Sequence, residues 1–149
     1  MKHNIWLLLA VIAISLALSA CHAPETAKVT RVIDGDTIVI SSGQKVRYIG
    51  IDAPEVRPEP EPHGMEAWNI NRDLVEGKEV RLERDVSDTD EYGRLLRYVY
   101  VGELMVNGEM VRRGLAEAKS YPPDDTNQEY LERLEGVARE MGRGMWAKE

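Results

Sequence analysis

The stretch "VRYIGIDAPE", Val46 to Glu55, decides the fold prediction because it begins as a half-buried strand and ends in an acidic turn. Side chains alternate between the two faces of a strand, so Arg47 is expected to share a face with Ile49 and Ile51. A guanidinium on an apolar face needs an anion, because an unpaired buried charge is costly. Either a structural carboxylate or a bound ligand must supply that anion.

Two further segments before this stretch have strand character. "KVTRVID" at 28–34 and "TIVI" at 37–40 are rich in Val, Ile and Thr, as is "KVRYIGI" at 45–51. The turn sequences "DGD" and "SSGQ" join the three segments, which predicts a three-stranded meander. "RPEPEPHG" at 57–64 is expected to be a loop, because its prolines exclude a helix or a central strand.

The second half of the chain predicts three helices and two more strands. A helix in "MEAWNINRDLVEG" is expected to end on Gly77, and "KEVRLER" and "RLLRYVYVG" are predicted strands. A short helix is expected around "EMVRRG", and a last one with Thr126 and Glu129 as a capping box and "GRG" at 142–144 as its end. The order predicts an α+β fold: a five-stranded barrel of the oligonucleotide- and oligosaccharide-binding type (OB-fold) with three helices.

The first residues have the pattern of an export signal. Lys2 precedes an unbroken run of apolar and small residues from Ile5 to Ala20. This run is shorter than the roughly 20 residues that a membrane-spanning helix prefers, which favours a cleaved or lipidated leader. "LSAC" at 18–21 resembles the lipobox of prokaryotic lipoproteins, with a free cysteine beside an ordinary cleavage site as the alternative.

The sequence therefore predicts a signal peptide at 1–20, a lipidated Cys21 with a linker at 21–27, and one folded domain at 28–149. The expected location is outside the cytoplasm, either anchored to a membrane through Cys21 or secreted. Cys21 is the only cysteine, so no internal disulfide can form.

Composition limits the partners that the domain can hold by charge. The chain has 149 residues, enough for one core, and a net charge of −7. A protein that binds many nucleic-acid phosphates by charge alone is normally basic. If the substrate is nucleic acid, a few local cations or a bound metal must hold it.

Two acidic turns flank the second and third predicted strands. "IDGDT" contributes Asp34 and Asp36, and "IDAPE" contributes Asp52 and Glu55. Neighbouring strands would bring Asp36 beside Asp52, where the carboxylates would repel each other unless a hard cation such as calcium bound them. Taken alone, "DGD" is more typical of an ordinary turn, and only its combination with "IDAPE" and Arg47 favours a cation site. Arg94, directly after a glycine turn, is either part of this set or a solvated charge.

Several motifs together resemble one family. "IDGDT", "VRYIGIDAPE", "HGMEA", "DEYGR", "NGEMVRRGLA" and "GMW" occur in the order and spacing of the staphylococcal nuclease (thermonuclease) family, from about Val29 to Trp146. The resemblance implies a calcium-dependent phosphodiesterase. It also implies that Asp36 and Asp52 are calcium ligands and that the Ala53 carbonyl is a further ligand. Asp34 would contact these ligands without binding the ion itself.

The resemblance also implies roles for the remaining site residues. Glu55 would be the general base or water-positioning residue, and Arg47 and Arg94 would bind the scissile phosphate, which would then be the anion that Arg47 requires. Tyr92 and Tyr121 would stack on bases, or else pack at the barrel rim. The chain departs from the family where Glu91 replaces a lysine and where "AEAKSYPP" lacks a tyrosine.

The predicted function is a secreted or surface-anchored calcium-dependent endonuclease that hydrolyses phosphodiester bonds in DNA, with RNA as an open second substrate. It needs no obligate protein partner. One alternative is a non-catalytic OB-fold module that binds nucleic acid, because a fold does not determine a function. Another is an acidic cluster that binds calcium only to stabilise the fold, which would leave Arg47 without a partner.

Overall fold

The computed structural model describes residues 25–148 of the chain. The expectations for the signal peptide and for Cys21 lie outside these residues. Residues 25–27, expected to belong to a linker, are already part of the first strand. Within residues 25–148, no helix combines the length and the apolar character needed to cross a bilayer.

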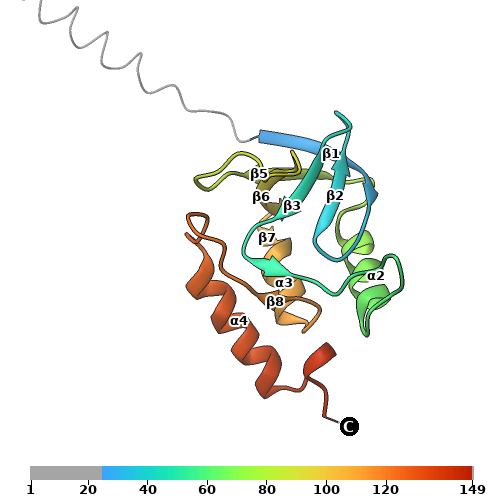
Figure 1. Cartoon of the computed structure of the whole chain (residues 1–149), viewed down its shortest axis with the longest axis vertical. Helices are drawn as coiled ribbons and strands as arrows, with labels where there is room; N and C mark the ends of the chain where they lie inside the picture. The colour runs from blue at the N-terminus through green and yellow to red at the C-terminus, as the bar shows by residue number, and fades with distance from the viewer. Residues whose placement is uncertain (1–24, 149) are drawn as a thin grey trace, which may run out of the picture.

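A closed five-stranded barrel forms the upper part of the molecule in Figure 1. Its strands are β1 (Glu25–Val32), β2 (Thr37–Ile40), β3 (Lys45–Tyr48), β5 (Glu79–Glu83) and β6 (Leu95–Val101). They pair in the order β3-β2-β1-β5-β6, and a parallel pairing of β3 with β6 closes the barrel. The short strand β7 (Leu104–Met105) pairs antiparallel with the end of β6, and β4 (Ile51–Asp52) pairs separately with β8 (Glu117–Ala118). The predicted barrel is confirmed.

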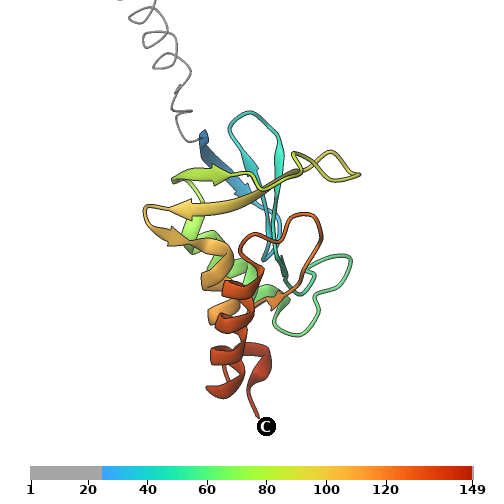
Figure 2. The same cartoon turned by 90° about the vertical axis from the view of Figure 1, so that its left-hand side faces the viewer.

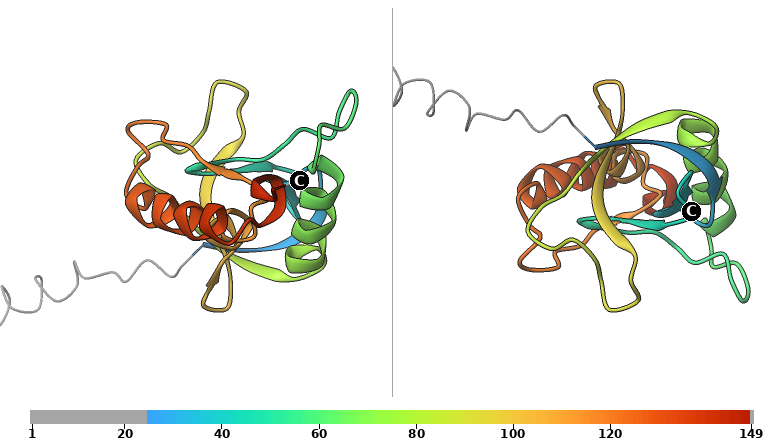
Figure 3. Two further views of the ribbon diagram at one scale, coloured as in Figure 1. Left: turned by 90° about the horizontal axis from the view of Figure 1, so that it is seen from below. Right: turned by 90° about the horizontal axis from the view of Figure 1, so that it is seen from above.

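Three α-helices accompany the barrel, as predicted. They are α2 (Gly64–Val75), α3 (Val106–Arg112) and α4 (Gln128–Glu140), and a 3-10 turn, η1 (Gly144–Trp146), follows α4. Figure 2 shows α3 and α4 below the strands, and Figure 3 shows α2 and α4 on opposite sides of the molecule. Helix α2 ends before Gly77, whose φ of 76° is left-handed as expected for a terminating glycine.

The alternation expected through "VRYIGI" is wrong, and a turn explains why. Strand β3 ends at Tyr48, and Gly50 turns the chain with a φ of +78° before β4 begins. Val46 and Tyr48 point into the barrel core, so Arg47 between them points outward. Ile49 and Ile51 are buried because the chain changes direction after β3, and they do not share a strand face with Arg47.

The capping box expected at the start of α4 is also wrong. The N-cap residue is Asn127, and it makes no side-chain cap. Thr126 instead binds Asp85, whose oxygens accept its amide N–H at 2.9 Å and its hydroxyl at 2.8 Å. Glu129 forms an ion pair with Arg133 at 2.6 Å. The tertiary partner Asp85 therefore replaces the local cap.

Candidate active site

The two acidic turns meet at one end of the barrel, as predicted, and Arg47 joins them. Its Nη1 lies 2.9 Å from Asp36 Oδ2 and its Nη2 lies 2.9 Å from Asp52 Oδ1. Two carboxylates of the protein itself therefore supply anions for Arg47. A calcium ion held by the same two aspartates would compete with Arg47 for them, so the objection to a purely structural calcium site stands.

Strand register explains why Asp36 occupies this position. Thr37, the first residue of β2, pairs with Arg47, so the residue before it lies beside the end of β3. The Asp36 carboxylate accepts the Ala53 N–H at 2.7 Å and the Thr37 hydroxyl at 3.0 Å. Asp34 supports the turn by accepting the Asp36 N–H at 3.0 Å.

Asp36 is a carboxyl group in an unusual electrostatic environment. It is only 5% exposed, and this burial raises the pKa of Asp36 to about 7, against the opposing charge of Arg47 and with a further rise from Asp34. A buried carboxylate with too little neighbouring positive charge is a group that a bound cation would stabilise.

Glu55 lies exposed on the loop after β4, near the same cluster. Partial burial of its carboxyl, followed by the negative charges of Asp34 and Asp52, raises the pKa of Glu55, while Arg47 opposes the rise. These charges act at short range in a solvated site. The structure therefore brings Glu55 to the end of the barrel where the two acidic turns meet.

The backbone around Glu55 is fixed by the loop that follows it. The Glu55 N–H donates to the Glu61 carboxylate and its carbonyl accepts the Glu61 N–H, both at 2.9 Å. Gly64, at the start of α2, packs so closely that a Cβ there would lie 2.4 Å from the Glu55 carbonyl oxygen. Sequence reasoning missed this role of Gly64, although "HGMEA" contained it.

Arg47 on β3 and Arg94, just before β6, line one cavity of about 260 Å³. Arg94 directly precedes β6, and its Nε donates to Asp90 Oδ2 at 2.6 Å. The other Asp90 oxygen accepts the N–H groups of Tyr92 and Arg94 at 3.0 Å. Burial of Asp90 acts to raise its pKa, but the hydrogen bonds from Arg94 outweigh this effect and lower the pKa of Asp90. Asp90 thus positions Arg94, a role that the sequence did not indicate.

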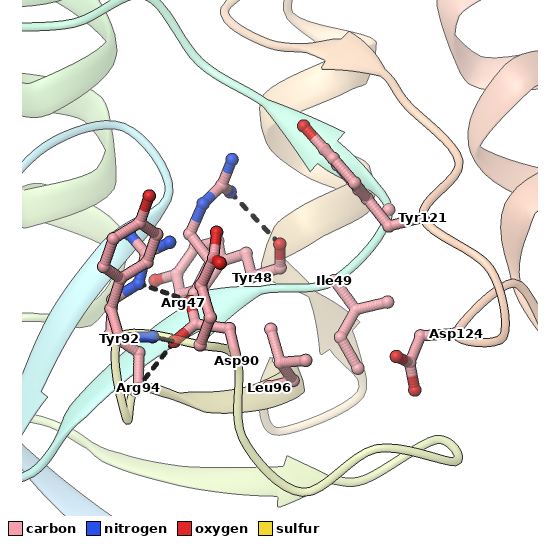
Figure 4. A pocket seen from close by; sticks show the side chains of 11 residues that line it. Arg47, Tyr48, Ile49, Asp90, Tyr92, Arg94, Leu96, Tyr121 and Asp124 are labelled. Atoms are coloured by element: carbon pink, nitrogen blue, oxygen red, sulfur yellow. Dashed lines mark hydrogen bonds and ion pairs between the residues drawn. The ribbon is translucent and has the colours of Figure 1, made fainter.

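The two predicted tyrosines stand on opposite sides of this cavity. Figure 4 shows Tyr92 with Arg94 on one side and Tyr121 on the other. Tyr92 is 76% exposed and Tyr121 is 44% exposed. The Arg94 guanidinium lies 5.5 Å from the centre of the Tyr92 ring. Both rings are therefore accessible at the mouth of the cavity, so the choice between base stacking and rim packing stays open.

Comparison with known proteins identifies the family. Residues 45–148 match the family described as staphylococcal nuclease homologue. The chain is 40% identical to thermonuclease of Staphylococcus hyicus over 129 residues, which cover 83% of this chain and 76% of that protein. The chain belongs to the staphylococcal nuclease family. The resemblance seen in the sequence motifs is confirmed.

Two further relatives agree with this assignment. Thermonuclease of Staphylococcus intermedius is 39% identical over 130 residues, covering 83% of this chain and 77% of that protein. Endonuclease YncB of Bacillus subtilis is 39% identical over 129 residues, covering 79% of this chain and 60% of that protein.

This member of the staphylococcal nuclease family has a lysine at the site that sequence reasoning missed. Lys119 Nζ lies 2.7 Å from Asp52 Oδ2, and this hydrogen bond raises the pKa of Lys119. The Lys119 N–H donates to the Gly50 carbonyl at 2.8 Å, directly after strand β8. A strand of two residues leaves no periodic pattern, so the sequence gave no signal for this contact.

The oxygen atoms at the site of this nuclease-family chain determine its fit to calcium. Within residues 25–148, no group of three or more His, Cys, Asp or Glu side chains is arranged to hold a metal ion. Asp36 and Asp52 nevertheless direct oxygens at one positive charge, the Arg47 guanidinium. Carboxylate oxygens are the ligands that calcium prefers. The donor set therefore fits a weakly held, partly hydrated ion that competes with Arg47 for the same oxygens.

Proposed function

We propose that this protein is a calcium-dependent nuclease that hydrolyses phosphodiester bonds in DNA, with RNA as a second substrate. The observation that carries the proposal is the convergence of Arg47, on β3, and Arg94, just before β6, on one cavity beside the acidic turns. Relatives named thermonuclease and endonuclease support the same activity.

The two arginines provide the charge that phosphodiester hydrolysis requires. Attack by water on the phosphorus builds negative charge on the phosphate oxygens, and guanidinium groups aimed at them stabilise the transition state more than the ground state. Arginine suits this task because it stays charged and binds two oxygens at once. Asp90 holds Arg94 by its Nε, and among the described residues no carboxylate pairs with its terminal amino groups.

Calcium would be held by Asp36 and Asp52, with the Ala53 carbonyl as a third ligand, and when bound it supplies charge that neutralises the phosphate. In the structure, Arg47 forms ion pairs with the carboxylates of Asp36 and Asp52. When calcium binds these carboxylates, Arg47 needs another anion. A substrate phosphate in the cavity is that anion. This competition reconciles the ion pairs in the structure with a role for Arg47 in binding substrate.

Glu55 is the proposed general base. It would orient a water molecule and take its proton as that water attacks the phosphorus. The raised pKa of Glu55 makes it a better base than an ordinary glutamate, whose pKa is about 4.3. Tyr92 and Tyr121 would stack on bases beside the scissile bond.

The calcium requirement fits an exported protein. A site with two carboxylates is expected to need calcium on the order of 10⁻⁴ to 10⁻³ M, a range typical of extracellular modules. Export through residues 1–20 and anchoring through a lipid on Cys21 are part of the same proposal, supported by the sequence pattern of the leader.

The proposal is tested by expressing residues 22–149 and measuring degradation of plasmid DNA and of RNA. We expect degradation with calcium and none with a chelator. Glu55→Gln and Arg94→Ala should each lower kcat about 10²- to 10⁴-fold. Arg84→Ala, an exposed arginine away from the cavity, is the control that should retain full activity.

Two outcomes would favour the alternatives. Binding of DNA by the parent protein without cleavage would favour the non-catalytic module. A calcium-dependent rise in Tm without cleavage would favour an acidic cluster that only stabilises the fold. Equal cleavage by the parent and by Glu55→Gln would remove the proposed mechanism.

A further inference from the structure

A second groove lies beside the candidate active site and gathers unpaired positive charge. It has a volume of about 640 Å³, and its basic side chains are Arg31, Lys45 and Arg57. All three are exposed, and none forms an ion pair with another residue in the described part of the chain. Arg47 and Arg94, by contrast, are held by carboxylates. In a chain with a net charge of −7, this concentration of unpaired cations calls for an explanation.

Strand register aligns these cations with the active site. Arg31 on β1 pairs with Val39 on β2, and Val39 pairs with Lys45 on β3, so Arg31 and Lys45 point to the same face of the sheet. Lys45 and Arg47 lie two residues apart on β3 and share that face, about 7 Å from each other along the strand. A line of three cations therefore runs across the outer face of the barrel and ends at the candidate site.

The loop after β4 adds a fourth cation to the same path. Arg57 follows Glu55 by two residues, and Val56 and Arg57 line the groove. In Figure 1 this loop lies beside α2, below β1 and β2. Lys45 and Val56, which border the groove, are close sequence neighbours of Arg47 and Glu55, so the groove lies beside the site where the scissile phosphate is proposed to bind.

The floor of the groove is largely apolar. Trp68 and Met65 of α2 contribute to it, and the Trp68 indole N–H donates to the Val32 carbonyl at 3.2 Å. Glu76 is the one acidic residue that lines the groove, and its carboxylate accepts the Val32 N–H at 3.2 Å. An aromatic, apolar floor bordered by cations suits a nucleic-acid strand, because bases and sugars cover apolar surface while phosphates meet the cations.

We propose that this groove binds the phosphate backbone of the nucleic-acid strand on one side of the scissile bond. The inference rests on the proposed function, because it assigns a path to the same substrate. It explains how an acidic protein holds a polyanion: the binding charge is concentrated along one line. The protein should therefore prefer long single strands, DNA or RNA, to dinucleotides.

The test compares two triple variants with the same change in charge. The groove variant is Arg31→Gln, Lys45→Gln and Arg57→Gln, and the control is Lys28→Gln, Arg84→Gln and Lys148→Gln, three exposed cations that do not line the groove. kcat/KM is measured on a dinucleotide and on single-stranded DNA and RNA of 20 nucleotides at several salt concentrations. Equal Tm values of the variants exclude misfolding.

We expect the groove variant to lower the ratio of kcat/KM on the 20-mer to that on the dinucleotide about tenfold. Its plot of log kcat/KM against log salt on the 20-mer should be shallower by about 2, because three phosphate contacts are lost. The control variant should keep the ratio and the slope of the parent. A groove variant that matches the control in both would overturn the inference.

Binding without cleavage separates this inference from the proposed function. The Kd of the 20-mer is measured by fluorescence anisotropy in a chelator for the parent and both variants. A parent that cleaves neither substrate contradicts the proposed function, while a Kd about tenfold weaker in the groove variant alone still supports the groove. A parent that cleaves both substrates, with equal Kd values for both variants, contradicts only the groove.

Discussion

At the scale of single residues, the cationic side chains at the candidate site already pair with both aspartates that would bind calcium. Arg47 binds Asp36 and Asp52, and Lys119 binds the remaining oxygen of Asp52. Any metal ion that uses these carboxylates must displace or share these partners. The residues that neutralise the site in this structure should therefore weaken its affinity for calcium.

Replacing Lys119 by methionine is expected to tighten calcium binding about threefold. The ammonium lies 2.7 Å from Asp52 Oδ2, so its removal frees an oxygen and removes a like charge beside the ion. The effect is modest because both partners are partly exposed. Isothermal titration calorimetry with calcium measures it, with Lys148→Met as the control. Unchanged or weaker calcium binding by the Lys119 variant would contradict this account.

Glu109 gives a prediction about stability and pH away from the site. This carboxylate is 7% exposed and accepts hydrogen bonds from Arg112 at 2.8 Å and from Arg113 at 2.7 Å. Hydrogen bonds from Arg112 lower the pKa of Glu109 against the opposing effect of burial, and Arg113 lowers it further. A folded-state pKa below the unfolded value stabilises the protein above the unfolded pKa, and the gain is lost as pH falls.

Glu109→Gln should accordingly lower the free energy of unfolding by about 2 kcal/mol at pH 7. The difference from the parent should be smaller at pH 3, below the unfolded pKa of about 4.3, because protonation of the unfolded carboxyl removes the stabilisation that the lowered pKa of Glu109 provides. Urea denaturation at both pH values measures this. Glu129→Gln, an exposed partner of Arg133, is the control and should change stability little. An equal loss at both pH values would show that the charge of Glu109 is not the cause.

At the scale of elements, the turn between β3 and β4 determines where the site residues point. Gly50 has a φ of +78°, and a Cβ on it would lie 2.5 Å from Leu131 Cδ1 in α4. The turn ends the alternation of β3 and directs Asp52 back towards Arg47. This short irregular connection therefore determines the directions of the site residues more than β3 or β4 does.

Gly50→Ala should destabilise the protein by about 3 kcal/mol, from a left-handed backbone and a close contact with Leu131. Gly43→Ala is a matched control, because Gly43 has a φ of +85° but open space around it. It should cost only about 1 kcal/mol. Chemical denaturation of both variants measures the difference. If the two variants lose equal stability, the contact with α4 contributes nothing.

At the scale of the whole molecule, α3 holds the barrel and the active-site turn together. Asn107 is fully buried, and its Oδ1 accepts the Val99 N–H of β6 at 2.9 Å. Its Nδ2 donates to the Ile49 carbonyl, also at 2.9 Å, in the segment that leads into the turn at Gly50. One side chain thus satisfies two backbone groups from distant parts of the chain.

Asn107→Ala should lower the free energy of unfolding by about 3 kcal/mol, because both backbone groups lose their partners in a buried site. Asn69→Ala is the control: the Asn69 amide donates to the Met65 carbonyl on the exposed side of α2. Urea denaturation should show little change for the control. A loss below about 1 kcal/mol for Asn107→Ala would mean that water replaces the side chain.

The sequence by itself determined the barrel and the positions of the candidate site residues along it. Strand segments, glycine turns and the acidic turns at Asp36 and Asp52 are set by local patterns, which can be read without knowing the fold. The prediction that Asp36 lies beside Asp52 needed only the pairing of neighbouring strands. For the same reason Arg94 was found at the entrance to β6.

Only the tertiary structure decided which partners these residues have. The Asp36 to Ala53 and Asp52 to Lys119 contacts join positions that are far apart in the chain. The second contact depends on the pairing of β4 with β8, two-residue strands that have no periodic pattern. The turn at Gly50 separated Ile49 and Ile51 from the strand face of Arg47, and Asp85 replaced the predicted cap of α4. Charge pairing depends on distances in space, and those distances are set by how the elements pack, which no local pattern records.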